Sequence, residues 1–376
     1  MKPKSLVLAQ FSKGVIWPVL ILGVFTYLAI SALPPSQITI YTAPAGTHYD
    51  NAVKYQKLFA TRGVTLDIIK VEDITNLDTH VAKADGPPAL SFAGTPLSAD
   101  RYPRIRAAGV TQLQPMFVFY NKNIIDLTSL VDLSGHNICL PPQLSITSQM
   151  AVSVLSPFGI TETNAAIFYL PLRDVISRLK SGTCDASIII LAIDNPIIAE
   201  LTRQPHLRIA DFRKLPALKR SLLNVEDVVI SQGSFDIKSN NPPQDIVTVA
   251  VPNTVIFRND LNPELVYMLL DIMKTTHHPA TMLSRQGEFP TLPTQILPPS
   301  EEVNAFYATG LPWASRELPY WLAAIVNKYL KALAIIFAVT QVFFAFQAIN
   351  NLARLIENGG GKVCHGSGGI ASLRAA

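Results

Sequence analysis

Short apolar segments alternate with helical segments through the middle of the chain, from residue 36 to about residue 316. Residues 38–41 and 89–93 are apolar or β-branched runs, whereas apolar residues recur at helical spacing in 49–61 and 147–155. Alternation of strands with helices is typical of α/β architecture, in which helices cover a largely parallel sheet. We therefore predict an α/β domain over residues 36–316.

An apolar segment precedes this domain. Residues 15–33 carry no charge and are long enough to cross a hydrocarbon core of about 30 Å. Lys2, Lys4 and Lys13 lie before it, which is the charge bias of a cytoplasmic flank. We predict a cytoplasmic N-terminus over 1–14 and an uncleaved transmembrane helix over 15–33. The alternative is a cleaved signal peptide, although no A-x-A site follows the segment.

A second apolar segment follows the domain. Residues 332–353 carry no charge, and aromatic residues such as Trp313 and Trp321 lie just before them, as in the aromatic belt of a membrane protein. We predict a C-terminal transmembrane helix over 318–350 and a cytoplasmic tail over 351–376. The alternative is a hydrophobic helix packed on the membrane or on the domain. Between helix 261–274 and this segment, the prolines from Pro279 to Pro319 predict an extended connection.

The chain has three cysteines, an odd number that does not suggest a disulfide framework. Cys139 and Cys184 are each expected in a buried strand, at opposite ends of a parallel sheet. A bridge between them is therefore not expected. Cys364 lies in the predicted tail, where a reducing cytosol would keep its thiol free.

The net charge of +4 is small, and no basic stripe with interleaved aromatic residues is present. The composition therefore does not indicate nucleic-acid binding. The sequence also lacks G-x-S-x-G, H-E-x-x-H and paired C-x-x-C motifs. We accordingly predict no catalytic residues, no metal and no cofactor.

Four polar, small-residue loops follow predicted strands. They lie at 42–49, 91–95, 141–149 and 193–196. In the first loop, the Thr47 hydroxyl is predicted to cap the following helix. Ligands of open α/β sheets bind beyond the carboxyl ends of the strands, so the four loops together predict one cleft, although each alone also fits an ordinary turn. The candidate ligand-binding residues are Thr42, Gly46, Thr47, His48, Tyr49, Ser91, Phe92, Gly94, Ser145, Thr147, Ser148, Asp194 and Asn195.

Several passages, in their order and spacing, resemble a known family over residues 38–350. They include YTAPAGTHYDNA, RIRAAGVTQLQPMFVFYNK, DLSGHNICLPPQLSITSQ, LKSGTCDASIII, NNPPQDIVTVAVPNTVIFRNDL, RQGEFP and FYATGLPWASRELPYWLAAIV. The family is the TAXI group of solute-binding proteins of TRAP transporters, in a variant with membrane anchors.

This resemblance implies a type II periplasmic-binding-protein fold: two α/β lobes with a cleft, flanked here by N- and C-terminal transmembrane helices. Lobe 1 is expected at about 36–118 and 247–300, and lobe 2 at about 119–246. The implied function is that of an anchored receptor in the bacterial inner membrane, with its main domain facing the periplasm. It would bind a small organic solute in the cleft for transport or sensing. A TRAP-type permease and the lipid bilayer are the implied partners.

One loop departs from the family pattern. Relatives commonly read Gly-Ser-Gly-Thr-Arg where this chain has LSITS at 144–148, so Ser148 replaces an arginine that grips carboxylates. Asp194 would repel an anion or hold an amine. The solute is therefore left open as a carboxylate, a zwitterion or a neutral molecule. If Leu144 and Ile146 plug the cleft, the alternative is a scaffold or interaction protein of a membrane complex that has lost ligand binding. An enzyme is the least favoured reading.

Overall fold

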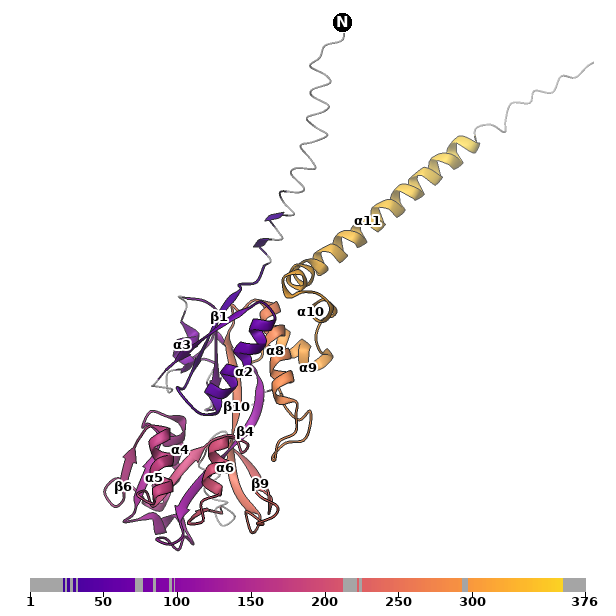
Figure 1. Cartoon of the computed structure of the whole chain (residues 1–376). Helices are drawn as coiled ribbons and strands as arrows, with labels where there is room; N and C mark the ends of the chain where they lie inside the picture. The colour runs from indigo at the N-terminus through magenta and orange to yellow at the C-terminus, as the bar shows by residue number, and fades with distance from the viewer. Residues whose placement is uncertain are drawn as a thin grey trace, which may run out of the picture. The chain divides into compact units, whose positions relative to one another are not determined.

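The computed structural model describes residues 33–71, 77–83, 86–94, 99–211, 225–292 and 297–360, together with residues 23, 26, 27, 30, 31, 97 and 222. The chain divides into two compact units. One is Leu33–Ala324, and the other joins Met1–Ala32 with Ile325–Ala376. The first unit contains the α/β domain (Figure 1).

The first part of the domain is a sheet with the strand order β2-β1-β3-β10-β4. Strands β1, β2 and β3 are parallel, while β10 runs antiparallel to β3 and to β4. Its elements are β1 (Gln37–Thr42), α2 (Thr47–Thr61), β2 (Thr65–Lys70), α3 (Leu77–Ala82), β3 (Ala89–Ala93), β4 (Ile105–Asn121), β10 (Ile246–Arg258), α8 (Pro263–His277), α9 (Glu301–Thr309) and α10 (Trp313–Glu317).

Alternating side chains give this sheet two buried faces. Ile38 and Ile40 of β1 share a core with Phe59 of α2 and with α8. On the opposite face, Ala93 of β3 packs in a core with Val81 of α3. Because side chains alternate along a strand, a sheet covered on both faces needs apolar residues at nearly every position, and all five residues of β3 are buried.

The second part of the domain continues the sheet in the order β4-β7-β5-β6, with β8 also paired to β4. Helices α4, α5 and α6 cover it (Figure 1). Its further elements are the short 3-10 helices η2 (Leu130–Leu133) and η3 (Ser156–Phe158), and β5 (Asn137–Leu140), α4 (Ile146–Leu155), β6 (Ala166–Tyr169), α5 (Leu172–Ser181), β7 (Ala186–Ile190), α6 (Pro196–Thr202), β8 (Leu207–Ile209) and β9 (Glu226–Ile230).

Two long strands connect the two parts. β4 pairs with β10 in the first part and with β7 in the second, and β10 pairs with β3 at one end and with β9 at the other. The structure therefore confirms an α/β domain with two lobes that are joined by crossing strands. The lobe boundaries predicted near residues 118 and 247 fall inside these strands. We call the parts lobe 1 and lobe 2 below.

β10 runs from Ile246 to Arg258 without a break, and Asn253 within it is buried and pairs with Gln112 of β4. One sequence-based expectation about local structure is wrong. The connection from Pro279 to Pro319 is not simply extended, since it contains α9 and α10. Val303 and Phe306 of α9 pack into the core of lobe 1, so proline content alone did not predict this segment.

The prediction that Cys139 and Cys184 are not bridged is also wrong. The two form a disulfide, with Cα atoms 5.9 Å apart. Cys184 is not a strand residue. It lies in the bend between α5 and β7, and the chain crosses there on the same face of the sheet as the Cys139 side chain. The bend, rather than the strand register, brings the two sulfur atoms together.

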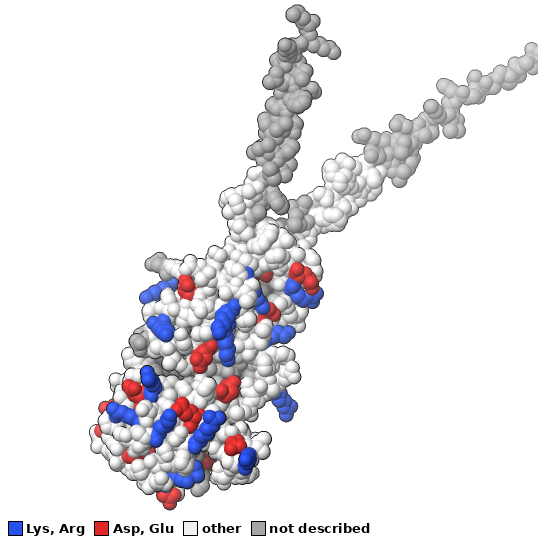
Figure 2. Space-filling view, in the orientation of Figure 1, with Lys and Arg blue, Asp and Glu red and all other residues white. Residues whose placement is uncertain are grey.

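The C-terminal helix α11 spans Tyr320–Gly360. Among the residues that the structure describes, no helix is sufficiently long and apolar to cross a membrane. Most of the predicted span 15–33, the N-terminus 1–14 and residues 361–376 lie outside the described residues. Figure 2 shows Lys and Arg mixed with Asp and Glu over the visible face of the compact unit.

Candidate functional site

A cavity of about 400 Å³ lies between the two lobes. Lobe 1 contributes residues 43–48 of the β1–α2 loop and Gly94 after β3. Lobe 2 contributes the ends of β5, β6 and β7 with the loops that follow, and the crossing strands add Gln114 and Val251. The wall is thus built at the carboxyl ends of parallel strands, the predicted position for a ligand in an open α/β sheet.

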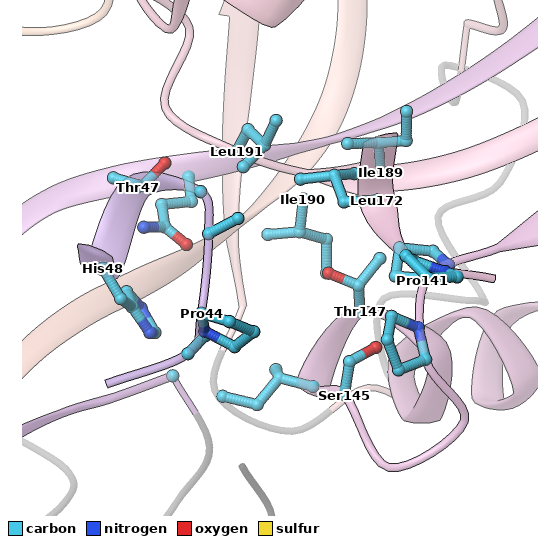
Figure 3. Close-up of a pocket in the computed structure, with 18 of the residues that line it drawn as sticks. Pro44, Thr47, His48, Pro141, Ser145, Thr147, Leu172, Ile189, Ile190 and Leu191 are labelled. Atoms are coloured by element: carbon cyan, nitrogen blue, oxygen red, sulfur yellow. The ribbon is translucent and has the colours of Figure 1, made fainter. Parts of the chain in front are cut away.

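Most of the wall is apolar. Figure 3 shows Pro44 and Pro141 facing the cavity from opposite sides, with the aliphatic side chains of Leu172 and Leu191 along a third side. The other apolar lining residues are Ala43, Ala45, Pro142, Ile146, Pro171, Ile189, Ile190 and Val251. Concave, mostly apolar cavities with a few polar groups are typical of small-molecule sites in proteins.

Six polar side chains interrupt this apolar wall. They are Thr47, His48, Gln114, Ser145, Thr147 and Arg173. Arg173 is the single charged residue among them and is exposed at the start of α5. The described residues contain no group of three or more His, Cys, Asp or Glu side chains that could hold a metal ion.

His48 is neutral at neutral pH. Burial lowers the pKa of its imidazole to about 4, and a hydrogen bond with the Asn253 side chain opposes part of that shift. The ring stacks on Phe92, with centroids 5.2 Å apart. A neutral imidazole has one nitrogen that donates and one that accepts, so His48 adds a polar contact to the cavity without adding charge.

Of the predicted binding residues, the structure brings six to the cavity wall: Gly46, Thr47, His48, Gly94, Ser145 and Thr147. The two glycines lie where the opposite lobe comes close. A Cβ atom on Gly46 would lie 3.3 Å from Leu191 Cδ2, and one on Gly94 would lie 3.5 Å from Ile146 Cδ1. Gly46 also has a φ of 88°, a conformation that favours glycine.

The other seven predicted residues lie away from the wall. Thr42, Ser91 and Phe92 are buried in lobe 1, where the Ser91 hydroxyl donates to the Tyr41 carbonyl. The Ser148 hydroxyl is likewise used internally, donating to the Pro141 carbonyl at 2.6 Å. Helix periodicity explains the Ser148 result, because this residue turns into lobe 2 while Thr147 faces the cavity.

The remaining three residues, Tyr49, Asp194 and Asn195, also lie outside the cavity wall. Lys70 Nζ lies 4.5 Å from the centroid of the Tyr49 ring. Asp194 is exposed and borders a different surface hollow. The predicted repulsion of an anion by Asp194 within the cleft is therefore wrong, because the turn before α6 points this carboxylate away from the cavity.

Two side-chain hydrogen bonds connect the lobes beside the cavity. Thr47 Oγ1 accepts from the Ala192 N–H at 3.0 Å, and Asn195 Nδ2 donates to Asp50 Oδ2 at 3.2 Å. The prediction that Thr47 caps α2 is wrong. Gly46 occupies the N-cap position of α2 and no side chain caps the helix, so the Thr47 hydroxyl is free to bind the other lobe.

The β5–α4 loop behaves as a conventional helix start. Ser145 is the N-cap residue of α4, and its hydroxyl oxygen accepts from the Ser148 N–H at 3.1 Å. Ile146 and Thr147 form the first turn of the helix and line the cavity. Leu144, one of the two residues considered as a plug, is 49% exposed and lies outside the cavity wall. Ile146 narrows the cavity without filling it.

Sequence reasoning missed Gln114 and the loop Pro171–Arg173. The loop follows the short strand β6, which is only half-buried and gave no clear strand pattern. Gln114 had a signal, since it is an amide within the otherwise apolar second half of β4.

A family model described as NMT1-like matches residues 95–282, half of the chain. The chain belongs to the NMT1-like family. The match includes Gln114 and the lobe 2 side of the cavity, but not the β1–α2 loop. No curated protein matches this NMT1-like protein.

Solved structures of two binding proteins are similar to this NMT1-like protein. One is AbpA from Streptococcus pneumoniae, a substrate-binding protein of an amino acid ABC transporter, bound to L-arginine. It is 18% identical with a TM-score of 0.39, over 64% of this chain and 88% of that one. The other is an ancestral arginine-binding protein bound to arginine, 13% identical with a TM-score of 0.41, over 66% of this chain and 95% of that one. At such low identities and TM-scores, the ligand has to be argued from this chain's own residues.

Proposed function

We propose that this protein is an extracytoplasmic solute receptor that binds a small organic molecule in the cavity between its lobes. The observation that carries this proposal is the cavity itself, whose wall comes from both lobes at the carboxyl ends of their strands. Within the described part of the sheet, only β4 and β10 cross between the lobes. Rotation about these two strands would open the cavity, as in hinge closure around a ligand.

The disulfide supports a location outside the cytoplasm. Cys139 and Cys184 are both buried and bonded to each other, and such bonds persist mainly in oxidising compartments. The lysines before the charge-free residues 15–33 favour the same orientation. We place the domain in the bacterial periplasm on this basis.

Anchoring in the inner membrane is the second element of the proposal. Large apolar side chains on α11 are exposed on all sides, including Ile335, Phe337, Val342, Phe344 and Ile349. The two terminal segments also meet, since Lys328 Nζ donates to the Ser31 carbonyl at 2.7 Å. Two apolar segments that contact each other are suited to a bilayer. Retention of the chain in the membrane pellet after alkaline carbonate extraction would test this, and release would contradict it.

The resemblance to the TAXI group extends the proposal to a partner. We propose that a TRAP-type permease or another membrane protein recognises and binds the closed form of the domain. The quoted motifs support this step, and co-purification of such a permease with the full chain from its native membrane would test it. Recovery of the chain without any integral membrane protein would contradict it.

Ligand binding is tested by thermal unfolding of the full chain against a library of organic acids, amino acids and neutral metabolites. A ligand at 100 times its dissociation constant adds about 2.7 kcal/mol to the free energy of unfolding, which raises the Tm by several degrees. Thr147→Trp would fill the cavity and should abolish the shift. The matched control is Val152→Trp, on the outer side of α4, where Val152 is 45% exposed.

If no compound of a broad library raises the Tm, the result would contradict the receptor function and favour the scaffold alternative. A shift that survives in Thr147→Trp would show that the ligand binds elsewhere on the protein.

A further inference from the structure

The described residues of the cavity wall include no carboxylate. Asp194 points away from it, and the carboxylate of Asp50 accepts from Asn195 at the lobe contact. An ammonium group placed in the cavity would therefore lose its hydration without gaining an anionic partner. Burial of an unpaired charge costs far more than burial of a hydrogen-bonded neutral group, so the wall disfavours amines.

The wall also offers little to a buried anion. Among the described residues of the wall, Arg173 is the single charged one, and it is exposed at the rim. The position at which the resembling family has an arginine is Ser148, whose side chain is buried and donates to the Pro141 carbonyl. A carboxylate deep in the cavity would thus lack a cationic partner, and His48 is neutral.

Gln114 is the polar group best placed to select a ligand. It lies on the crossing strand β4, lines the cavity and is 6% exposed. Its Nε2 atom is buried and has no hydrogen-bond partner among the described residues. An unpaired buried amide is unfavourable, and a ligand oxygen that accepts from it would remove that penalty.

We propose that the cavity selects an uncharged, mainly apolar molecule with a carbonyl oxygen that accepts from Gln114. The proposal rests on the proposed function, because it names the class of solute for the same cavity. The aliphatic and proline side chains of the wall pack on the apolar body of the molecule, and the Gln114 amide fixes the position of its polar end. Charged analogues with the same body are excluded by desolvation.

The test is a matched set of three probes with the same apolar body: 3-phenylpropanamide, 3-phenylpropanoate and 3-phenylpropylamine. Their affinities for the full chain are measured by titration calorimetry at pH 7.5. The amide is expected to bind at least tenfold more tightly than either charged probe. Equal or tighter binding of the propanoate or the amine would overturn the proposal without any variant.

Two variants then test whether Gln114 is responsible for the preference for the amide probe. Gln114→Leu replaces the amide with a slightly shorter apolar side chain that has no N–H, and should weaken binding of the amide about tenfold. Gln112→Leu is the matched control on the same strand, because Gln112 lies outside the cavity wall, and should leave the affinity unchanged. An unchanged affinity in Gln114→Leu would overturn the role of Gln114.

The outcomes separate this proposal from the proposed function. A charged library compound whose binding is abolished by Thr147→Trp would overturn the neutral-ligand class and retain the receptor. Failure of all probes and of the whole library would overturn both.

Discussion

The β1–α2 loop and the β5–α4 loop are built from the same kinds of residues, but their hydroxyl groups have different partners. In the β5–α4 loop, Ser145 caps its own helix. In the β1–α2 loop, Gly46 takes the N-cap position, and the hydroxyl of Thr47, one residue later, binds the main chain of lobe 2. A shift of one residue therefore separates a local helix cap from a contact that holds the two lobes together.

Lowering the pH should destabilise the β1–α2 loop but not the β5–α4 loop. Residues 141–147 contain no titratable side chain, whereas the pKa of His48 is lowered to about 4 by burial. Between pH 6.5 and 4 the unfolded state binds the extra proton, so stability is full above pH 6.5 and falls as the pH decreases towards 4. The loss approaches about 1.4 kcal/mol per pH unit.

Thermal unfolding from pH 7.5 to pH 4 measures this loss, and His48→Gln should make the dependence shallower. His277 contributes a background in the same direction, because burial and the nearby Lys54 lower its pKa to about 3. An identical pH dependence in His48→Gln and the wild type would contradict the role assigned to His48.

Gly46→Ser gives the first loop the N-cap residue of the second. The serine would require a φ of 88° and would place its Cβ 3.3 Å from Leu191 Cδ2. We expect a loss of about 2–3 kcal/mol in the free energy of unfolding, measured by urea denaturation. A variant as stable as the wild type would show that the serine cap compensates for the backbone strain.

Thr47→Val removes the acceptor for the buried Ala192 N–H while keeping the shape of the side chain. We expect a loss of about 1–2 kcal/mol and a shift towards an open form. Small-angle scattering of the full chain should show a larger radius of gyration than in the wild type. No change in either quantity would mean that water replaces the threonine oxygen.

Ser145→Ala removes the cap of α4 and should cost about 1 kcal/mol. Because this hydroxyl does not contact lobe 1, scattering should be unchanged, in contrast to Thr47→Val. An opening of the lobes in Ser145→Ala would contradict the distinction between the two loops.

Much of the site could be predicted because it depends on local rules. A strand, a small-residue turn and a helix start predict where the chain reverses, and the carboxyl ends of parallel strands lie on one edge. Four of the residues selected by this reasoning, namely Gly46, His48, Gly94 and Thr147, line the cavity. The reasoning did not distinguish Thr147 from Ser148, since the direction of a side chain within the first helical turn depends on how the helix packs.

The sequence by itself determined the α/β class, the two glycines at the close approach and the small net charge. The fold class follows from hydrophobic periodicity, and the glycines follow from the small-residue turns after the strands. Tertiary structure decided the pairing of Cys139 with Cys184, the removal of Asp194 from the cleft, and the exposure of Gln114 to the cavity. Each of these depends on contacts between segments far apart in the chain, which local patterns do not encode.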